Sequence, residues 1–243
     1  MELRGKVAVV TGGAVRVGRA LVEALASAGC DCFIHYGRSE TAAREVEGAA
    51  LQLGVRARSF GADLSDSGQA RAVLDRAIEE LGPVDILVNS AALFLEGGLL
   101  ETDDEIWERQ FAINLRAPFL LSQAFARRLP EGREGRIVNI VDARIFRPGT
   151  DHLAYRLTKT ALHSLTEILA LELAPRVTVN AVALGAILPP PGEPQTYLDE
   201  LAASQVPLER AGDPRQVADA VLYLLRQEFV TGETIRLDGG QFL

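Results

Sequence analysis

The sequence predicts an α/β fold: a single domain over residues 1–243, built as a doubly wound parallel sheet of about seven strands flanked by helices. Short apolar runs alternate with helical patterns from one end of the chain to the other, which is typical of this fold class. Apolar residues make up 48% of the 243 residues, enough for a sizeable core. A chain of this length is often one α/β domain.

The first strand, expected at residues 7–10, runs into a glycine-rich turn. Residues 11–18 read T-G-G-A-V-R-V-G, and a helical pattern of apolar residues follows them. Strand, glycine-rich turn and helix in this order are what a dinucleotide-binding fold of the Rossmann type requires. The glycines let the backbone approach a pyrophosphate, and the helix N-terminus offers it free N–H groups. A glycine turn without a ligand is the alternative.

The second strand is expected at residues 32–36, followed by a helix over residues 40–53. In dinucleotide-binding folds an acid at this strand end binds the ribose 2′-hydroxyl of NAD, whereas a basic residue accommodates the 2′-phosphate of NADP. The stretch from His35 to Ser39 contains no acid. Arg38 and Arg16 can make charge-assisted bonds to a phosphate, and Ser39 adds a hydroxyl donor. We therefore expect NADPH/NADP+ as the cofactor, with a merely solvated Arg38 as the alternative.

The middle of the chain continues the alternation. We expect strands at residues 57–61 and 85–92, and helices at residues 67–81 and 105–128. Asn114 lies within the last of these helices, in an apolar stretch. Asparagine has a low helix propensity, so we expect the side chain of Asn114 to make a specific hydrogen bond.

Tyr155 and Lys159 are four residues apart, on a helix expected after the strand at residues 136–141, and so lie on one helix face. A free tyrosine has a pKa near ~10, and a neighbouring ammonium lowers that pKa, which makes the phenol a usable proton donor. An ordinary exposed pair is the alternative. Lys6 and Lys159 are the only lysines of the chain, which favours a specific role for Lys159.

The last part of the chain contains strands expected at residues 178–185 and 234–237 and helices expected at residues 196–203 and 213–225. Between them, the prolines of residues 189–194 exclude a helix or a central strand. We interpret this segment as a loop over the site, and such loops often act as lids.

Two motifs give the chain a resemblance to the short-chain dehydrogenase/reductase family: T-G-x-x-x-x-x-G at residues 11–18 and the later Y-x-x-x-K. The resemblance covers the whole chain. The resemblance implies an NADP-dependent oxidoreductase in which Asn114 bends its helix and orders a water near Lys159. It implies cofactor contacts from Thr11, Gly12, Arg16, Val17, Gly18, His35, Tyr36, Arg38, Ser39, Asp63, Leu64, Asn89, Ser90, Ala91, Tyr155, Lys159, Gly185 and Ile187. Arg16 and Leu184 depart from the family pattern, which has glycine and proline there. The alternative interpretation of Asp63 is an acid at a helix N-terminus.

Asp142 lies thirteen residues before Tyr155, where that family has a serine that helps to hold the substrate carbonyl. A carboxylate there would repel a developing alkoxide, but it suits a substrate with N–H donors. T-G-x-x-x-R-x-G at residues 11–18, H-Y-x-R-S at residues 35–39 and V-D-A at residues 141–143 together resemble the pteridine reductases. That resemblance implies catalytic roles for Asp142, Tyr155, Lys159 and Asn114, and substrate contacts from Phe94, Asp142 and Tyr155. A packing role for Phe94 and a structural one for Asp142 are the alternatives.

The sequence therefore predicts an NADPH-dependent reductase of a pterin-like or other C=N or C=O substrate. A carbonyl or 3-oxoacyl-carrier-protein reductase is one alternative, against which Asp142 counts; a dinucleotide-binding sensor without turnover is another. Apolar positions between residues 161 and 173 spread over more than one helix face. Because members of the family are commonly tetramers or dimers, we expect a homo-oligomer, with a tetramer first.

The charge and the composition of the chain argue against several classes of binding partner. A net charge of −8 and a pI near 5.0 argue against nucleic-acid binding. No apolar run reaches the length of a membrane span, and the N-terminus leads into a strand without a signal peptide, so we expect a cytoplasmic protein without a membrane partner. Cys30 and Cys32 have no further cysteine or histidine cluster, which favours packing over a metal or redox pair, and we expect no metal site.

Overall fold

One parallel sheet of seven strands organises the chain in the computed structural model, which describes residues 1–243. The strands lie side by side in the order β3-β2-β1-β4-β5-β6-β7, and every neighbouring pair is parallel. Their bounds are β1 Val7–Val10, β2 Asp31–Tyr36, β3 Ala57–Gly61, β4 Ile86–Asn89, β5 Gly135–Asp142, β6 Val177–Leu184 and β7 Thr234–Leu237. The α/β fold class predicted from the sequence is confirmed.

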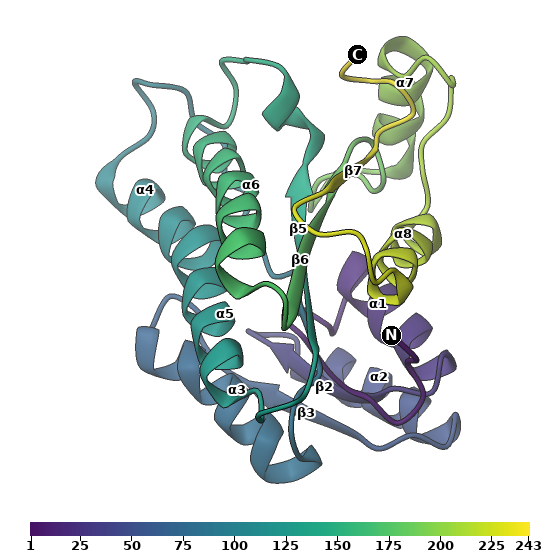
Figure 1. Ribbon diagram of the computed structural model, residues 1–243. Coiled ribbons are helices and arrows are strands. Elements are labelled where there is room, and N and C mark those ends of the chain that lie inside the picture. Colours follow the sequence, from purple (N-terminus) through teal and green to yellow (C-terminus); the bar gives the residue numbers. More distant parts are fainter.

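Helices cover both faces of this sheet (Figure 1). One face packs against α1 Arg16–Ser27, α2 Glu40–Gln52 and α8 Pro214–Arg226, and the other against α3 Ser67–Leu81, α5 Ala117–Arg128 and α6 Leu153–Leu173. The chain also forms α4 Asp104–Phe111 and α7 Gln195–Gln205. Two shorter elements are a single turn of π-helix at Ala112–Arg116, called the π-turn below, and a single turn of 3₁₀ helix at Ala143–Phe146, called the 3₁₀ turn.

The central strand β1 contributes to the cores on both faces. Ala8 and Val10 pack in one core, whereas Val7 and Val9 pack in the other. A strand covered on both faces must be apolar at every position, which is why residues 7–10 form a continuous apolar run rather than an alternating one. The strand order reverses between β1 and β4, and in such sheets ligands bind in the crevice at the carboxyl ends of the strands beside that reversal.

The long helix expected at residues 105–128 is interrupted. It ends as α4, passes through the π-turn and resumes as α5, with Pro118 in the first turn of α5. Proline cannot donate to the carbonyl four residues earlier, and its ring crowds that carbonyl. In this helix that carbonyl belongs to Asn114, so the irregular turn falls where the α-helical hydrogen bond would fail.

A buried chain of side-chain hydrogen bonds joins two central strands to α6. Asn89 Nδ2 on β4 donates to Asn139 Oδ1 on β5 at 2.8 Å, and Asn139 Nδ2 donates to Thr166 Oγ1 on α6 at 2.9 Å. Because unsatisfied buried amides are costly, these bonds fix the rotation of α6 against the sheet. They therefore help to set the position of the side chains at the start of α6.

Two further expectations concerned the two cysteines and membrane-spanning segments. Cys30 and Cys32 are buried without a disulfide and pack in the core, and burial raises the pKa of the Cys30 thiol to about 12. Such thiols are unreactive, which agrees with the packing interpretation. None of the helices combines the length and the apolar character that a membrane-spanning segment needs.

Candidate active site

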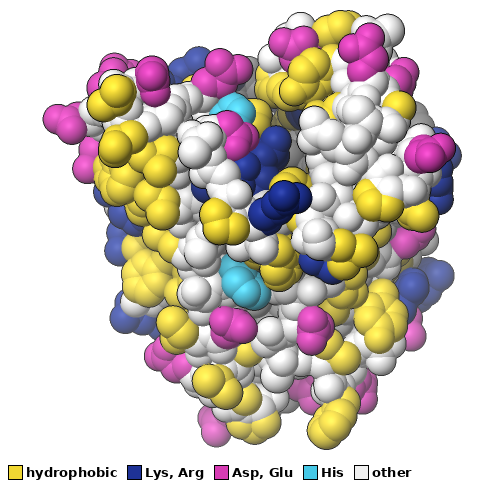
Figure 2. All heavy atoms as spheres, turned by 90° about the horizontal axis from the view of Figure 1, so that it is seen from above, with side chains coloured by type: hydrophobic (Ala, Val, Ile, Leu, Met, Phe, Trp, Pro, Cys, Tyr) yellow, Lys and Arg dark blue, Asp and Glu magenta, His cyan; other side chains and the backbone are white.

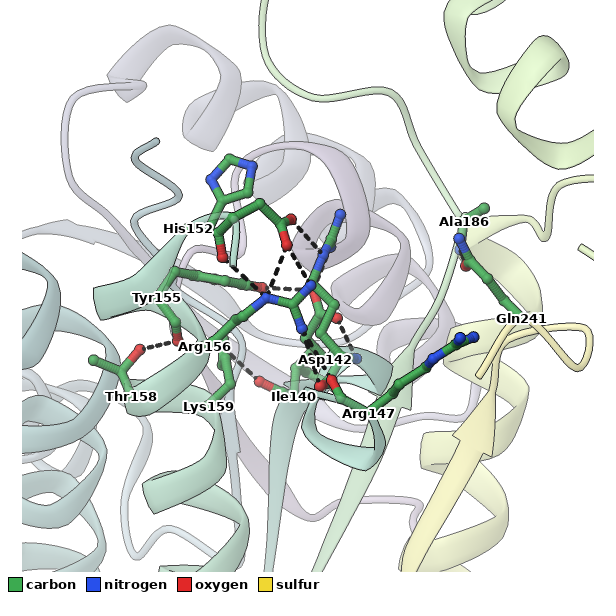
Figure 3. A network of polar contacts seen from close by, with 12 residues as sticks. Ile140, Asp142, Arg147, His152, Tyr155, Arg156, Thr158, Lys159, Ala186 and Gln241 are labelled. Carbon is green, nitrogen blue, oxygen red and sulfur yellow. Dashed lines mark hydrogen bonds and ion pairs between the residues drawn. The ribbon is translucent and has the colours of Figure 1, made fainter. Parts of the chain in front are cut away.

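Tyr155 and Asp142 form the centre of the candidate site, at the carboxyl end of β5 and the first turn of α6 (Figure 3). The Tyr155 hydroxyl donates to Asp142 Oδ2 at 3.0 Å. Both residues are buried, with exposed fractions of 7% for Tyr155 and 8% for Asp142. The thirteen-residue separation in sequence thus brings a phenol and a carboxylate into direct contact.

The environment raises the pKa of Tyr155 well above its ordinary value of 10.0. Burial is the main cause and the Asp142 carboxylate the next, while the cation of Arg144 opposes them. The phenolate is disfavoured because it would lie beside a carboxylate in a site with little water. The expectation that Lys159 lowers the pKa of this phenol is therefore wrong for this structure.

Lys159 lies beside the Tyr155 ring and not at its hydroxyl. Its Nζ is 5.8 Å from the ring centroid and donates to the Ile140 carbonyl at 2.8 Å. Burial lowers the pKa of Lys159 to about 8, partly offset by the Asp142 carboxylate. This lysine is therefore a buried cation that can lose its proton near neutral pH.

Asn114 makes the specific bonds expected from its poor helix propensity. Its Oδ1 accepts from the Leu93 N–H at 2.7 Å, and its Nδ2 donates to the Leu93 carbonyl at 2.9 Å and to Thr158 Oγ1 at 3.2 Å. Thr158 in turn donates to the Tyr155 carbonyl at 2.7 Å. The π-turn is thereby tied both to the loop after β4 and to the start of α6.

Phe94 lies on that same loop, next to the phenol. Its ring meets the Tyr155 ring edge-on with centroids 4.7 Å apart, and the His152 ring stacks on it at 4.1 Å. His152 Nδ1 is held at 3.0 Å from the Leu95 carbonyl. The aromatic side chain singled out from the sequence is thus fixed beside the hydroxyl that would donate a proton.

The glycine-rich turn has the close contacts that a pyrophosphate site needs. A Cβ on Gly18 would lie 2.0 Å from the Gly12 carbonyl oxygen, so helix α1 can approach the turn only with glycine there. Arg16 has a φ of 54°, in the left-handed region that glycine favours. The chain therefore keeps a glycine-like backbone where Arg16 replaces the glycine of the family pattern.

Three of the expected cofactor residues, His35, Thr11 and Asn89, have side chains that make hydrogen bonds within the protein. His35 is 2% exposed; its Nδ1 accepts from the Gly12 N–H at 3.2 Å, so Nε2 carries the proton and donates to the Ala62 carbonyl at 3.0 Å. Thr11 Oγ1 accepts from the Ser90 and Ala91 N–H groups, both at 3.0 Å. Asn89 is 2% exposed and bonded to Asn139. The sequence pattern did not reveal these bonds; among the three side chains, Asn89 Oδ1 is buried without a hydrogen-bond partner.

The end of β2 and the segment after β3 are more open. Arg38 is exposed, and Ser39 begins α2 without a side-chain capping bond. Asp63 Oδ1 accepts from the Ser65 N–H at 2.8 Å and from its hydroxyl at 2.7 Å, and these bonds lower the pKa of Asp63. Asp66 rather than Asp63 caps α3, so the helix-terminus interpretation of Asp63 is wrong, whereas Leu64 is buried in the core.

The segment after β6 is fixed at its start and crosses to the glycine-rich turn. A Cβ on Gly185 would meet Asp238 at 2.7 Å, and Gln241 Oε1 accepts from the Ala186 N–H at 3.1 Å (Figure 3). Ile187 is buried. Arg16 Nη2 donates to the Pro189 carbonyl at 2.7 Å, so the proline-rich loop contacts the residue that follows the glycine-rich part of the turn.

Sequence reasoning missed Arg144, which lies in the 3₁₀ turn directly after Asp142. Its Nη1 donates to Asp142 Oδ2 at 3.1 Å. A cation two residues after a buried acid is the signal that points to it. The carboxyl-edge face of the molecule is hollowed at its centre, where Lys and Arg side chains gather, while Asp and Glu lie on its rims (Figure 2).

These features fit a bound NADP: a close-packed glycine turn at the N-terminus of α1, no acid at the end of β2, and an exposed Arg38 there. Val17, Ser90 and Ala91 are half-buried, with Gly12 tightly packed against Ala91.

Comparison with known proteins gives matches along the whole chain. Residues 13–241 match the family model described as enoyl-(acyl carrier protein) reductase. The 3-oxoacyl-[acyl-carrier-protein] reductase FabG of Aquifex aeolicus is 36% identical over 257 residues, spanning 100% of this chain and 99% of that protein. A short-chain type dehydrogenase/reductase of Picea abies is 33% identical over 253 residues, spanning 98% of this chain and 93% of that protein.

Several solved structures similar to this chain contain a bound cofactor. The FolM alternative dihydrofolate reductase 1 from Brucella canis, complexed with NADP, has a TM-score of 0.95 and 36% sequence identity to this chain. The match covers 99% of this chain and 95% of that chain.

Proposed function

The chain belongs to the short-chain dehydrogenase/reductase family of NADP-dependent oxidoreductases, and we propose that its substrate is a pterin-like heterocycle reduced at a C=N or C=O bond. The observation that carries this proposal is the hydrogen bond from Tyr155 to Asp142. A carboxylate at this position accepts hydrogen bonds, so it suits a ring with N–H groups and not the growing negative charge of a simple ketone. The similarity to a FolM alternative dihydrofolate reductase supports the same substrate class.

In the proposed reaction NADPH supplies the hydride, and Tyr155 supplies the proton. Asp142 orients the hydroxyl and, with the high pKa of Tyr155, keeps the proton on the phenol until a basic substrate atom takes it. The cations of Arg144 and Lys159 then offset the charge left on the phenolate. Asn114 and Thr158 hold the first turn of α6 in place for the transfer.

A 3-oxoacyl-carrier-protein reductase is the second candidate. The 36% identity to FabG of Aquifex aeolicus favours it. Asp142 counts against it, because a carboxylate already bonded to the proton donor would repel the oxyanion that a ketone develops.

The cofactor assignment predicts the effect of Arg38→Asp. If Arg38 binds the 2′-phosphate, this variant should bind NADPH at least tenfold more weakly, since a hydrogen bond to a charged group contributes about 1.5–3 kcal/mol. NADH binding should change little. Fluorescence titration of both nucleotides measures this, with Arg44→Asp on the exposed side of α2 as the matched charge control. Equal weakening by the two variants would contradict the assignment.

The substrate assignment predicts that Asp142→Ser loses reduction of dihydrobiopterin by roughly ten- to a hundredfold, the kinetic equivalent of one charge-assisted hydrogen bond. Activity on a β-keto ester should be kept or gained, because the serine no longer repels an oxyanion. Asp151→Ser is the control, since Asp151 lies in the same segment and bonds Arg156, not Tyr155. Steady-state kinetics that show equal losses on both substrates would leave only the family assignment standing.

We further propose that the chain assembles as a homo-oligomer, with a tetramer as the first choice and a dimer as the second. Large apolar side chains on α5 and α6 are open to solvent, namely Phe119 at 41%, Ile168 at 56% and Leu171 at 85% exposure. Exposed apolar surface on helices suits contact with another copy. Sedimentation at micromolar concentration should give a mass of two or four chains, and a monomer would refute the proposal.

A further inference from the structure

Arg144 is held rigidly next to the candidate proton donor. Its backbone N–H donates to Asp142 Oδ1 at 2.8 Å and its Nη1 to Asp142 Oδ2 at 3.1 Å, so that one residue binds both oxygens of the carboxylate. Its carbonyl accepts from Arg156 Nη1 at 3.2 Å. Backbone and side chain are thus both fixed before any substrate arrives.

Most of the hydrogen-bonding capacity of this guanidinium is unused. An arginine side chain has five N–H donors. Only Nη1 of Arg144 makes a side-chain hydrogen bond within the protein; its Nε forms an ion pair with Asp151 at 3.6 Å without a hydrogen bond. The side chain is 28% exposed. Free donors therefore remain on a side chain that is packed into the site.

The guanidinium lies close to where a substrate would react. Tyr155 Oη and Arg144 Nη1 both bind Asp142 Oδ2, at 3.0 and 3.1 Å, so the two donors are at most about 6 Å apart. Arg144 Cζ is 5.6 Å from the centroid of the Phe94 ring. A substrate that takes a proton from Tyr155 would therefore lie near Arg144, because both side chains bind Asp142 Oδ2.

The charge of this region favours an anion. The segment from residue 142 to residue 159 contains four Arg and Lys side chains but only two Asp, in a chain whose net charge is −8. The two acids are already engaged, Asp142 with Tyr155 and Arg144, and Asp151 with Arg156. The excess positive charge thus lies on the same hollowed face as the candidate site (Figure 2).

We propose that Arg144 binds a carboxylate carried by the substrate close to the bond that is reduced. A guanidinium pairs with a carboxylate through two parallel N–H bonds, a geometry that its unused donors allow. The inference rests on the proposed reductase function and narrows its substrate class to acidic compounds. Arg144 is then a residue that determines specificity as well as a counter-ion of Asp142.

The test uses the NADP+-loaded enzyme and pairs of substrate analogues of which one member carries a carboxylate and the other a neutral group in its place. Isothermal titration should show pterin-6-carboxylate binding at least tenfold more tightly than 6-hydroxymethylpterin, the equivalent of one charge-assisted bond. The same preference should hold for acetoacetate over methyl acetoacetate. Arg144→Gln should abolish the preference by weakening only the carboxylates, while Arg144→Lys keeps the charge and should retain part of it.

The proposal would be overturned if the wild type bound both members of each pair equally, or bound none of them. It would also be overturned if Arg144→Gln weakened the binding of both members equally, because Arg144 would then only support Asp142. Arg147→Gln removes a neighbouring cation that does not contact Asp142; a similar loss of preference there would assign the effect to general charge. Failure of the reductase function gives a different result, namely no NADPH oxidation with any carbonyl or pterin substrate, whatever the binding preference.

Discussion

The hydrogen bond between the Tyr155 hydroxyl and the Asp142 carboxylate is the interaction on which the rest of the site depends. It joins the end of β5 to the start of α6, so it requires that helix to lie in one orientation on the sheet. The buried chain from Asn89 through Asn139 to Thr166 supplies that orientation from the middle of the sheet. Asn114 supplies it again from the π-turn, through Thr158.

A buried carboxylate is costly unless its charge is compensated and its oxygens are bonded. Asp142 meets both conditions through Arg144, which offers a backbone N–H and a cation from one residue. Lys159 adds a second cation, but it is directed to the Ile140 carbonyl and the Tyr155 ring. The phenol therefore keeps its proton in this structure, and the site is built to release that proton to a substrate atom basic enough to take it.

The strands and most helices follow from local patterns: apolar runs for strands buried on both faces, and a glycine turn before α1. The family resemblance indicated a bend at Asn114, but the π-turn itself also depends on the contact of Asn114 with a loop distant in sequence, which local patterns do not show. The pairing of Asp142 with Tyr155 follows from spacing and family resemblance, but the raised pKa of the phenol depends on burial, which only the fold determines. For the same reason the supporting roles of His35 and Asn89 were not visible in the sequence.

Titration of the Tyr155 phenol tests this account most directly. The chain has four tyrosines, so ring-labelled tyrosine resolves each one by NMR, and Tyr155→Phe assigns the signal. The account predicts that Tyr155 in the cofactor-free protein stays protonated above the ordinary tyrosine pKa of about 10, and that Asp142→Asn, which keeps the shape but removes the charge, lowers its pKa. A Tyr155 that titrates below that value in the wild type, or is unchanged by Asp142→Asn, would contradict the account.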